Sequence, residues 1–175
     1  MNNKNPTHFK CIEFDPQTCA LSLSSRVIPQ PKANEVLVRV WGSPINPSDR
    51  LFCQGLYGTK ASRPVVPGFE GSGTVVKTGS SWMARRLLGK RVSGAVQGTD
   101  GFWAEHVLLP ASQCLPVSKG PLGLGSFRAL AKKTGFIFCA NGSCKPVGKN
   151  GPPTFQKVPR SGNPRCAPAR FGRST

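Results

Sequence analysis

The stretch Pro44–Gly79, PINPSDRLFCQGLYGTKASRPVVPGFEGSGTVVKTG, decides the fold of this 175-residue chain. It opens with Asn46-Pro-Ser-Asp49, in which Pro47 suits the first position of a helix and Asp49 suits its first turn. It closes with a Gly-rich segment, residues 67–73, that enters a strand. Between them the loop Gln54-Gly-Leu-Tyr-Gly58 holds the only tyrosine of the chain. The stretch therefore predicts a short helix, a loop and a strand.

Short strands are predicted on both sides of this stretch. The clearest is Glu35–Val40, in which polar and apolar residues alternate. The others are His8–Phe14, Leu21–Ile28, Gly73–Lys77, Lys90–Val96, Phe102–Leu109 and Gln113–Val117. Gln97-Gly-Thr-Asp-Gly101 is typical of a hairpin loop. Short strands separated by Gly and Pro predict a mainly β fold, a small and mostly antiparallel barrel or sandwich. Trp41, Phe69, Phe102 and Trp103 are its predicted core or cleft aromatics.

Charge divides the chain near Val117. Residues 1–117 carry 13 Lys and Arg and all 7 acids, whereas residues 118–175 carry 11 Lys and Arg and no acid. The second segment has a helix candidate at Phe127–Lys133 and an apolar run at Phe136–Ala140. From Lys145 on it shows no periodicity and is rich in Gly, Pro and Arg, which predicts disorder. We expect a folded domain, residues 1–117, and a disordered or out-of-frame basic tail, residues 118–175.

Several motifs agree in order and spacing over residues 30–117. They are Ile45-Asn-Pro-Ser-Asp49, Gln54-Gly55, Tyr57-Gly58, Pro67–Gly73, Gly89–Val92 and Gly101–Glu105. With these motifs the chain resembles the medium-chain dehydrogenase/reductase superfamily, and within it the zinc-independent branch of quinone oxidoreductases and 2-enoyl thioester reductases. The resemblance implies a GroES-like, partly open β-barrel, here incomplete.

The resemblance also implies a role for Tyr57. In the similar enoyl thioester reductases, the matching tyrosine donates a proton after a nicotinamide delivers hydride to an activated C=C bond. A phenol can do this if it lies within hydrogen-bond reach of the substrate. The alternative, that Tyr57 is an aromatic residue at the lip of a cleft, stays open.

Four further residues are candidates to orient substrate or cofactor: Asn46, Asp49, Phe69 and Glu70. For Asp49 the main alternative is turn capping, and for Glu70 it is a structural hydrogen bond. Asn46 and Phe69 stand where zinc-using relatives place a cysteine and a histidine, so no metal is predicted. His106 is interpreted as a strand residue and not as a base.

Complete members of this family use NADPH or NADH, held by a dinucleotide-binding domain with a G-x-G-x-x-G/A turn. Gly120-Pro-Leu-Gly123-Leu-Gly125 has the wrong spacing, and Arg128 stands where a third Gly or Ala is required. The segment 143–150 is an imperfect phosphate loop. We therefore predict no Rossmann domain and no cofactor bound to this chain.

Two functions remain. The first is the substrate-binding half of an NAD(P)H-dependent oxidoreductase acting on an enone, enoyl thioester or quinone, truncated and inactive alone. The second is a non-enzymatic barrel whose tail binds nucleic acid nonspecifically. Whether the chain is itself an enzyme stays open, as does homodimer formation.

The location and the cysteines give further expectations. No apolar run approaches the roughly 20 residues of a membrane span, and no membrane partner is predicted. The start of the sequence is polar, so we expect a cytoplasmic protein with reduced thiols, and leave a mitochondrial location open. Cys11, Cys19, Cys53 and Cys114 are expected to behave as small apolar residues.

Overall fold

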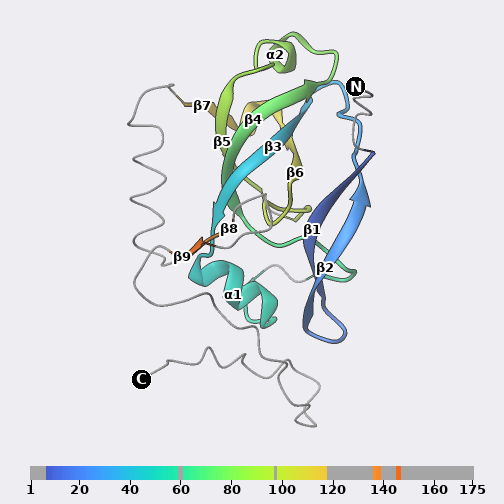
Figure 1. Ribbon diagram of the computed structural model, residues 1–175, viewed down its shortest axis with the longest axis vertical. Helices are drawn as coiled ribbons and strands as arrows, with labels where there is room; N and C mark the ends of the chain where they lie inside the picture. The colour runs from blue at the N-terminus through green and yellow to red at the C-terminus, as the bar shows by residue number, and fades with distance from the viewer. Residues whose placement is uncertain (1–6, 59–60, 97, 118–135, 139–144, 147–175) are drawn as a thin grey trace.

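The computed structural model describes residues 7–58, 61–96, 98–117, 136–138 and 145–146, and these form a mainly β structure (Figure 1). The mainly β prediction is confirmed, and the described strands form two open sheets, with no closed barrel among them. The strands are β1 (His8–Asp15), β2 (Ala20–Val27), β3 (Glu35–Pro44), β4 (Glu70–Thr78), β5 (Arg91–Ala95), β6 (His106–Pro110), β7 (Cys114–Pro116), β8 (Phe136–Phe138) and β9 (Lys145–Pro146). The helices are α1 (Pro47–Cys53), α2 (Trp82–Arg85) and the 3₁₀ helix η1 (Ala111–Gln113).

Strand β3 lies at the centre of the larger sheet. It pairs antiparallel with β4 along one edge, and along the other edge with β6 and, at its end, with β8. Strand β4 pairs with β5, which pairs with β7. Val36 and Val38 are fully buried in this sheet and pack with Val75, Val92 and Phe102. The apolar positions of Glu35–Val40 therefore form the core of the domain.

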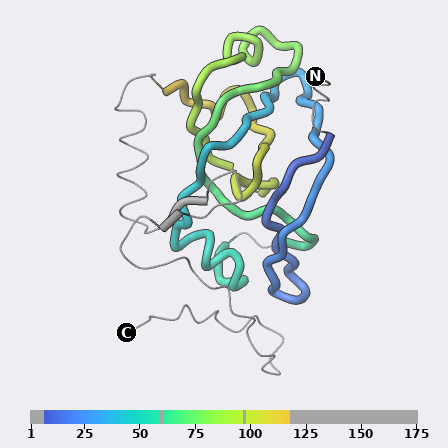
Figure 2. Tube along the Cα trace, viewed as in Figure 1, coloured from blue at the N-terminus to red at the C-terminus, as the bar shows by residue number. Residues whose placement is uncertain are grey.

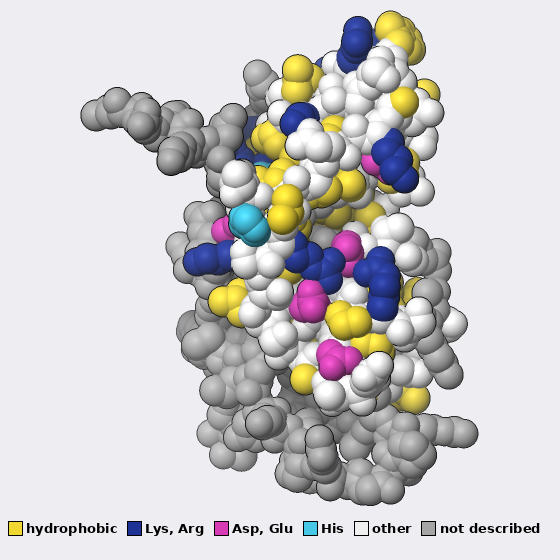
Figure 3. All heavy atoms as spheres, turned by 90° about the vertical axis from the view of Figure 1, so that its right-hand side faces the viewer, with side chains coloured by type: hydrophobic (Ala, Val, Ile, Leu, Met, Phe, Trp, Pro, Cys, Tyr) yellow, Lys and Arg dark blue, Asp and Glu magenta, His cyan; other side chains and the backbone are white. Residues whose placement is uncertain are grey.

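Strands β1 and β2 form a separate antiparallel hairpin beside the larger sheet (Figure 2). Phe9 and Cys11 of β1 pack against Val66, Trp103 and Ala104. Arg26 of β2 forms ion pairs with Glu13 at 2.6 Å and with Asp100 at 2.7 Å. Acidic and basic side chains lie next to each other on the side of the molecule that carries β1 and β2 (Figure 3).

The predicted hairpin between residues 90–96 and 102–109 is wrong. Strand β5 pairs with β4 and β7, whereas β6 pairs with β3. The cause is the backbone of residues 101–103, which pairs with residues 66–68 instead: Gly101 N–H donates to Val66 O (2.7 Å), and Phe102 N–H to Gly68 O (2.8 Å). These bonds lead the chain away from β5 before β6 begins.

The predicted core aromatics separate into two groups. Phe102 (0% exposed) and Trp103 (5%) lie in the core as expected. Trp41 lies on the outer side of β3, 36% exposed, with the Arg91 guanidinium 4.6 Å from its ring centroid, so the core interpretation of Trp41 is wrong.

The thiols follow the expectation in part. Cys11 and Cys114 are buried and Cys53 is half-buried, all as free thiols. Burial raises the pKa of Cys53 to about 12 and that of Cys114 to about 11, which keeps both neutral. Cys19 is disulfide-bonded, in contrast to the predicted reduced thiol.

Five residues of the segment 118–175 are described, and they are strands. Strand β8 pairs with Ser43 and Pro44 of β3, and β9 pairs with β8. The sequence predicted disorder for β9 and an apolar run at β8. The helix candidate Phe127–Lys133 and the Gly-rich segments at 120–125 and 147–150 lie outside the described residues.

Candidate functional site

Helix α1 begins where the sequence predicted. Asn46 is its N-cap, with extended backbone, and Pro47 occupies the first turn, where a missing N–H costs nothing. The Asp49 carboxylate accepts a hydrogen bond from the Asn46 backbone N–H at 2.7 Å. The Asn-Pro-Ser-Asp spacing thus fixes the start of α1 at the end of β3.

The other carboxylate oxygen of Asp49 reaches across the fold. It accepts a hydrogen bond from the Phe69 backbone N–H at 2.9 Å, so one side chain joins α1 to the turn that enters β4. Asp49 is fully buried, and burial raises the pKa of its carboxyl group, against the two hydrogen bonds that lower it. This is the arrangement that the turn-capping alternative predicts.

Four aromatic side chains form a row that starts in the loop after α1. The Tyr57 ring lies 5.1 Å from the Phe69 ring, and Phe69 lies 5.4 Å from Phe52 in an edge-to-face contact. Phe52 continues to Phe14 of β1 at 5.8 Å. Such pairs are favourable arrangements of aromatic rings. The half-buried Tyr57 is therefore held by a tilted ring contact with Phe69, whose backbone Asp49 holds in turn.

Tyr57, Phe69 and Glu70 line one groove. Its volume is about 640 Å³, within the range of small-molecule sites. Ser48 of α1 completes this side, and the other is supplied by β5 with the residue after it, by η1 and by β7; the residues there are Ser93, Gly94, Ala95, Val96, Ser112, Gln113 and Leu115. Of the five predicted site residues, the structure brings three to the groove, whereas Asn46 and Asp49 are not among its lining residues.

Ser48, Ser93 and Gln113 are polar groove residues that the sequence did not single out. Ser48 lies inside the Asn-Pro-Ser-Asp motif, so its place on α1 was a usable signal. Ser93 and Gln113 reach the groove only because β5 and η1 fold beside β4. Glu70 is exposed, and its backbone carbonyl accepts a hydrogen bond from the buried Ser43 hydroxyl at 2.6 Å. That bond is structural and leaves the Glu70 carboxylate at the groove.

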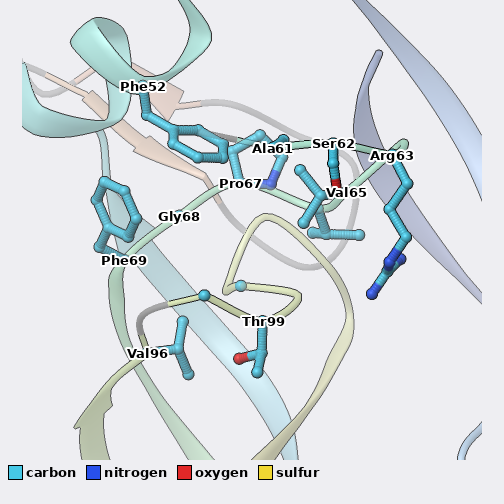
Figure 4. Close-up of a pocket in the computed structure, with 13 residues that line it drawn as sticks. Phe52, Ala61, Ser62, Arg63, Val65, Pro67, Gly68, Phe69, Val96 and Thr99 are labelled. Carbon is cyan, nitrogen blue, oxygen red and sulfur yellow. The ribbon is translucent and has the colours of Figure 1, made fainter. Parts of the chain in front are cut away.

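A smaller pocket of about 110 Å³ lies on the other side of Phe69. Figure 4 shows Phe52, Val65, Phe69 and Val96 around it, with Arg63 and Thr99 on the loops at one side. Phe69 and Val96 line both cavities, so Phe69 forms a wall between them.

No metal-binding group is present among the described residues, where no cluster of three or more His, Cys, Asp or Glu side chains occurs. His106, the first residue of β6, is half-buried and meets the edge of the Phe9 ring at 5.9 Å. Burial lowers the pKa of its imidazole. It lines neither cavity and is a strand residue, as the sequence indicated.

Residues 32–119 match the family of alcohol dehydrogenase GroES-like domains. The chain belongs to this family. It is thereby a member of the medium-chain dehydrogenase/reductase superfamily, an oxidoreductase family, and the predicted resemblance is confirmed.

Relatives of this GroES-like chain include a protein named for synaptic vesicle membranes and a reductase. It is 38% identical over 95 residues to the synaptic vesicle membrane protein VAT-1 homolog of Rattus norvegicus, covering 53% of this chain and 23% of that protein. It is 42% identical over 88 residues to a mitochondrial enoyl-[acyl-carrier-protein] reductase of Caenorhabditis elegans, covering 50% of this chain and 25% of that protein.

A solved structure agrees. A putative NADPH:quinone reductase from Mesorhizobium loti superimposes with a TM-score of 0.59 at 29% identity, over 74% of this chain and 46% of that one. The GroES-like chain therefore spans a minor part of its relatives. Among its described residues, no helix is long and apolar enough to cross a membrane.

Proposed function

We propose that residues 7–117 form the substrate side of an NAD(P)H-dependent reductase of activated C=C bonds or quinones. The observation that carries this proposal is the groove in which Tyr57, Phe69 and Glu70 meet. The reductases named above supply the reaction class.

In this proposal Tyr57 is the proton donor. Hydride reaches the β-carbon of the enone, charge collects on the carbonyl oxygen, and the α-carbon takes a proton. The tilted ring contact with Phe69 holds the phenol ring at the groove without using its hydroxyl, which leaves the O–H to meet a substrate. Ser48 offers a hydroxyl donor to the carbonyl oxygen from the α1 side of the groove, whereas the Ser93 hydroxyl already donates to the Gly71 carbonyl at 3.3 Å.

The nicotinamide supplies the hydride when bound. We propose that its dinucleotide is held by a separate domain, because the sequence contains no G-x-G-x-x-G/A turn between a strand and a helix. The nucleic-acid alternative rests on the basic segment 118–175, which lies almost wholly outside the described residues, and no observation favours it.

Two titrations of the full chain test the proposal. Saturation-transfer NMR with crotonyl thioester should detect binding, and Tyr57→Phe should weaken it by about twofold to tenfold, the loss of one hydrogen bond. The ring contact with Phe69 is kept in this variant, so a folding defect is not expected. If the unchanged chain and Tyr57→Phe bound crotonyl thioester equally, Tyr57 would not contact the substrate.

Calorimetry with NADPH and NADH should give no binding heat. A micromolar affinity for either dinucleotide would contradict the part of the proposal that assigns the cofactor to a separate domain, and would leave the role of Tyr57 standing.

A further inference from the structure

The connection between β4 and β5 forms a closed, ordered projection, here called the α2 tip (residues 80–91). The Ser81 hydroxyl caps α2 by accepting a hydrogen bond from the Ala84 N–H at 3.3 Å. The Gly89 N–H returns to Val75 O at 2.9 Å and closes the projection. Ala84 and Leu87 point inward and join the core. The outward side chains are therefore presented by a fixed backbone.

Those outward side chains are unusually apolar. Trp82 is 70% exposed, Met83 51% and Leu88 57%. Three large apolar residues within seven positions form a patch of the kind that marks an interaction surface. None of the three contributes to the core clusters of the described residues.

The patch is surrounded by positive charge. Arg85, Arg86 and Lys90 are exposed, and the sequence has no acid between Glu70 and Asp100. The Arg86 guanidinium lies 4.5 Å from the centroid of the Trp82 ring. Figure 3 shows basic and hydrophobic side chains together at the upper end of the molecule, where Figure 1 places α2. The α2 tip therefore presents exposed apolar side chains and positively charged side chains together.

We propose that the α2 tip binds the surface of an anionic lipid bilayer, with Trp82, Met83 and Leu88 inserted at the headgroup level. Indole rings favour this depth, where one end of the ring is apolar and the other is wet. Arg and Lys beside an inserted apolar patch meet the phosphates of anionic lipids. The α2 tip has both features that such binding requires: apolar side chains that can insert, and cationic side chains beside them.

The same charges would attract nucleic acid, but the apolar residues favour lipid. A base needs an open aromatic face for stacking. Arg86 already covers one face of Trp82, and Met83 and Leu88 offer a base no π face. An acyl chain region accepts all three side chains. The sequence predicted no membrane partner because no segment can span a bilayer, but surface binding requires no span.

The α2 tip and the Glu70 side of the groove lie at opposite ends of β4. Glu70 begins the strand at the groove, and Thr78 ends it next to the tip (Figure 1). The other side of the groove includes Ser112 and Gln113 of η1, which contacts α2.

Vesicle sedimentation of the full chain tests the proposal. Vesicles with roughly 30% phosphatidylserine should bind it, and neutral phosphatidylcholine vesicles should not. Met83→Ser/Leu88→Ser should weaken binding at least tenfold. Arg85→Gln and Arg86→Gln should weaken it about fivefold each. The matched control is Leu23→Ser/Val27→Ser, which changes two side chains of similar exposure (69% and 66%) outside the tip.

Residues 118–175 are basic and can attract anionic vesicles by charge alone, so a second measurement is needed. Brominated lipids should quench the fluorescence of Trp82, and Trp82→Phe should abolish that quenching. Sedimentation without quenching, or sedimentation unchanged in Met83→Ser/Leu88→Ser, would overturn the proposal. The proposal would also be overturned if the chain did not bind lipid and instead bound a single-stranded oligonucleotide, or itself, in a way that the Met83→Ser/Leu88→Ser variant loses.

Discussion

At the scale of the residue, Asp49 connects sequence, fold and groove. Its two carboxylate oxygens accept hydrogen bonds from the backbones of Asn46 and Phe69, which are 23 positions apart in the chain. The Phe69 ring in turn contacts the Tyr57 ring. The position of the candidate proton donor therefore depends on a fully buried carboxylate.

Replacing Asp49 by Asn tests this connection. Asn offers one acceptor oxygen where Asp offers two, so one buried N–H loses its partner. We expect a loss of about 1–3 kcal/mol in unfolding free energy, measured by urea denaturation. Glu70→Gln changes an exposed carboxylate of the same region and should alter stability by less than about 0.5 kcal/mol. Equal effects of the two substitutions would show that the Asp49 bonds add nothing.

The sequence could predict half of this arrangement. Asn46-Pro-Ser-Asp49 is a local pattern, and its capping bond spans three residues. The bond to Phe69 depends on the path of the chain between α1 and β4, which no local pattern encodes. For the same reason the sequence pointed to Asn46 and Asp49, which do not line the groove, and missed Ser93 and Gln113, which do.

His106 predicts a pH dependence. Burial lowers the pKa of His106 in the folded protein below the unfolded value of about 6.5. Nearby Glu105 raises this pKa, and Arg39 lowers it. Stability from the neutral imidazole is therefore complete above that unfolded pKa and is lost as pH falls through the folded pKa. Unfolding free energy should decrease from pH 7 to pH 5, and His106→Gln should decrease less. His8→Gln, at an exposed histidine, should follow the unchanged protein; a parallel pH profile for all three would refute the assignment.

At the scale of the element, strands were predictable and their pairing was not. The alternation in Glu35–Val40 identified β3, but the sequence placed Lys90–Val96 opposite Phe102–Leu109 across a turn-like segment. Pairing was decided by bonds of residues 101–103 to residues 66–68, which depend on distant sequence. Helix α2 was missed because four residues are too few to show helical periodicity.

Glycine decides the close approach of β3 and β4. A Cβ added at Gly73 would collide with the carbonyl oxygen of Arg39, a backbone atom that cannot rotate away. Gly73→Ala should therefore cost about 1–3 kcal/mol, the range for overpacking, or abolish folding. The control is Gly58→Ala, because a Cβ there meets nothing within 4 Å and its φ is not in the left-handed region. Thermal unfolding of both variants gives the measurement, and similar melting temperatures would contradict the steric account.

At the scale of the whole molecule, the spacing of several motifs identified the superfamily over residues 30–117, and the family match covers residues 32–119. This spacing places the turns and glycines that the fold requires, so it identifies the family where amino-acid composition does not. The division of the described chain into two sheets was not predicted. It depends on contacts of β1 with Val65 and Ala104, which lie in loops far along the chain.

Arg26 links the β1–β2 hairpin to the loops that precede β4 and β6, and this link predicts how the molecule opens. The guanidinium of Arg26, on β2, bonds Glu13 of β1 and Asp100, whose other oxygen accepts from the Val66 N–H at 3.0 Å. Arg26→Gln breaks this partly buried network and should cost about 1–2 kcal/mol.

Because the hairpin shares no strand ladder with β3–β6, its amides should exchange faster by roughly tenfold while those of β3 and β4 keep their protection. Lys32→Gln, at a cation outside the network, should change neither set. Equal acceleration in β1–β2 and β3–β4 would instead mean that both sheets open as one cooperative unit, and that Arg26 stabilises the whole molecule rather than the attachment of the hairpin.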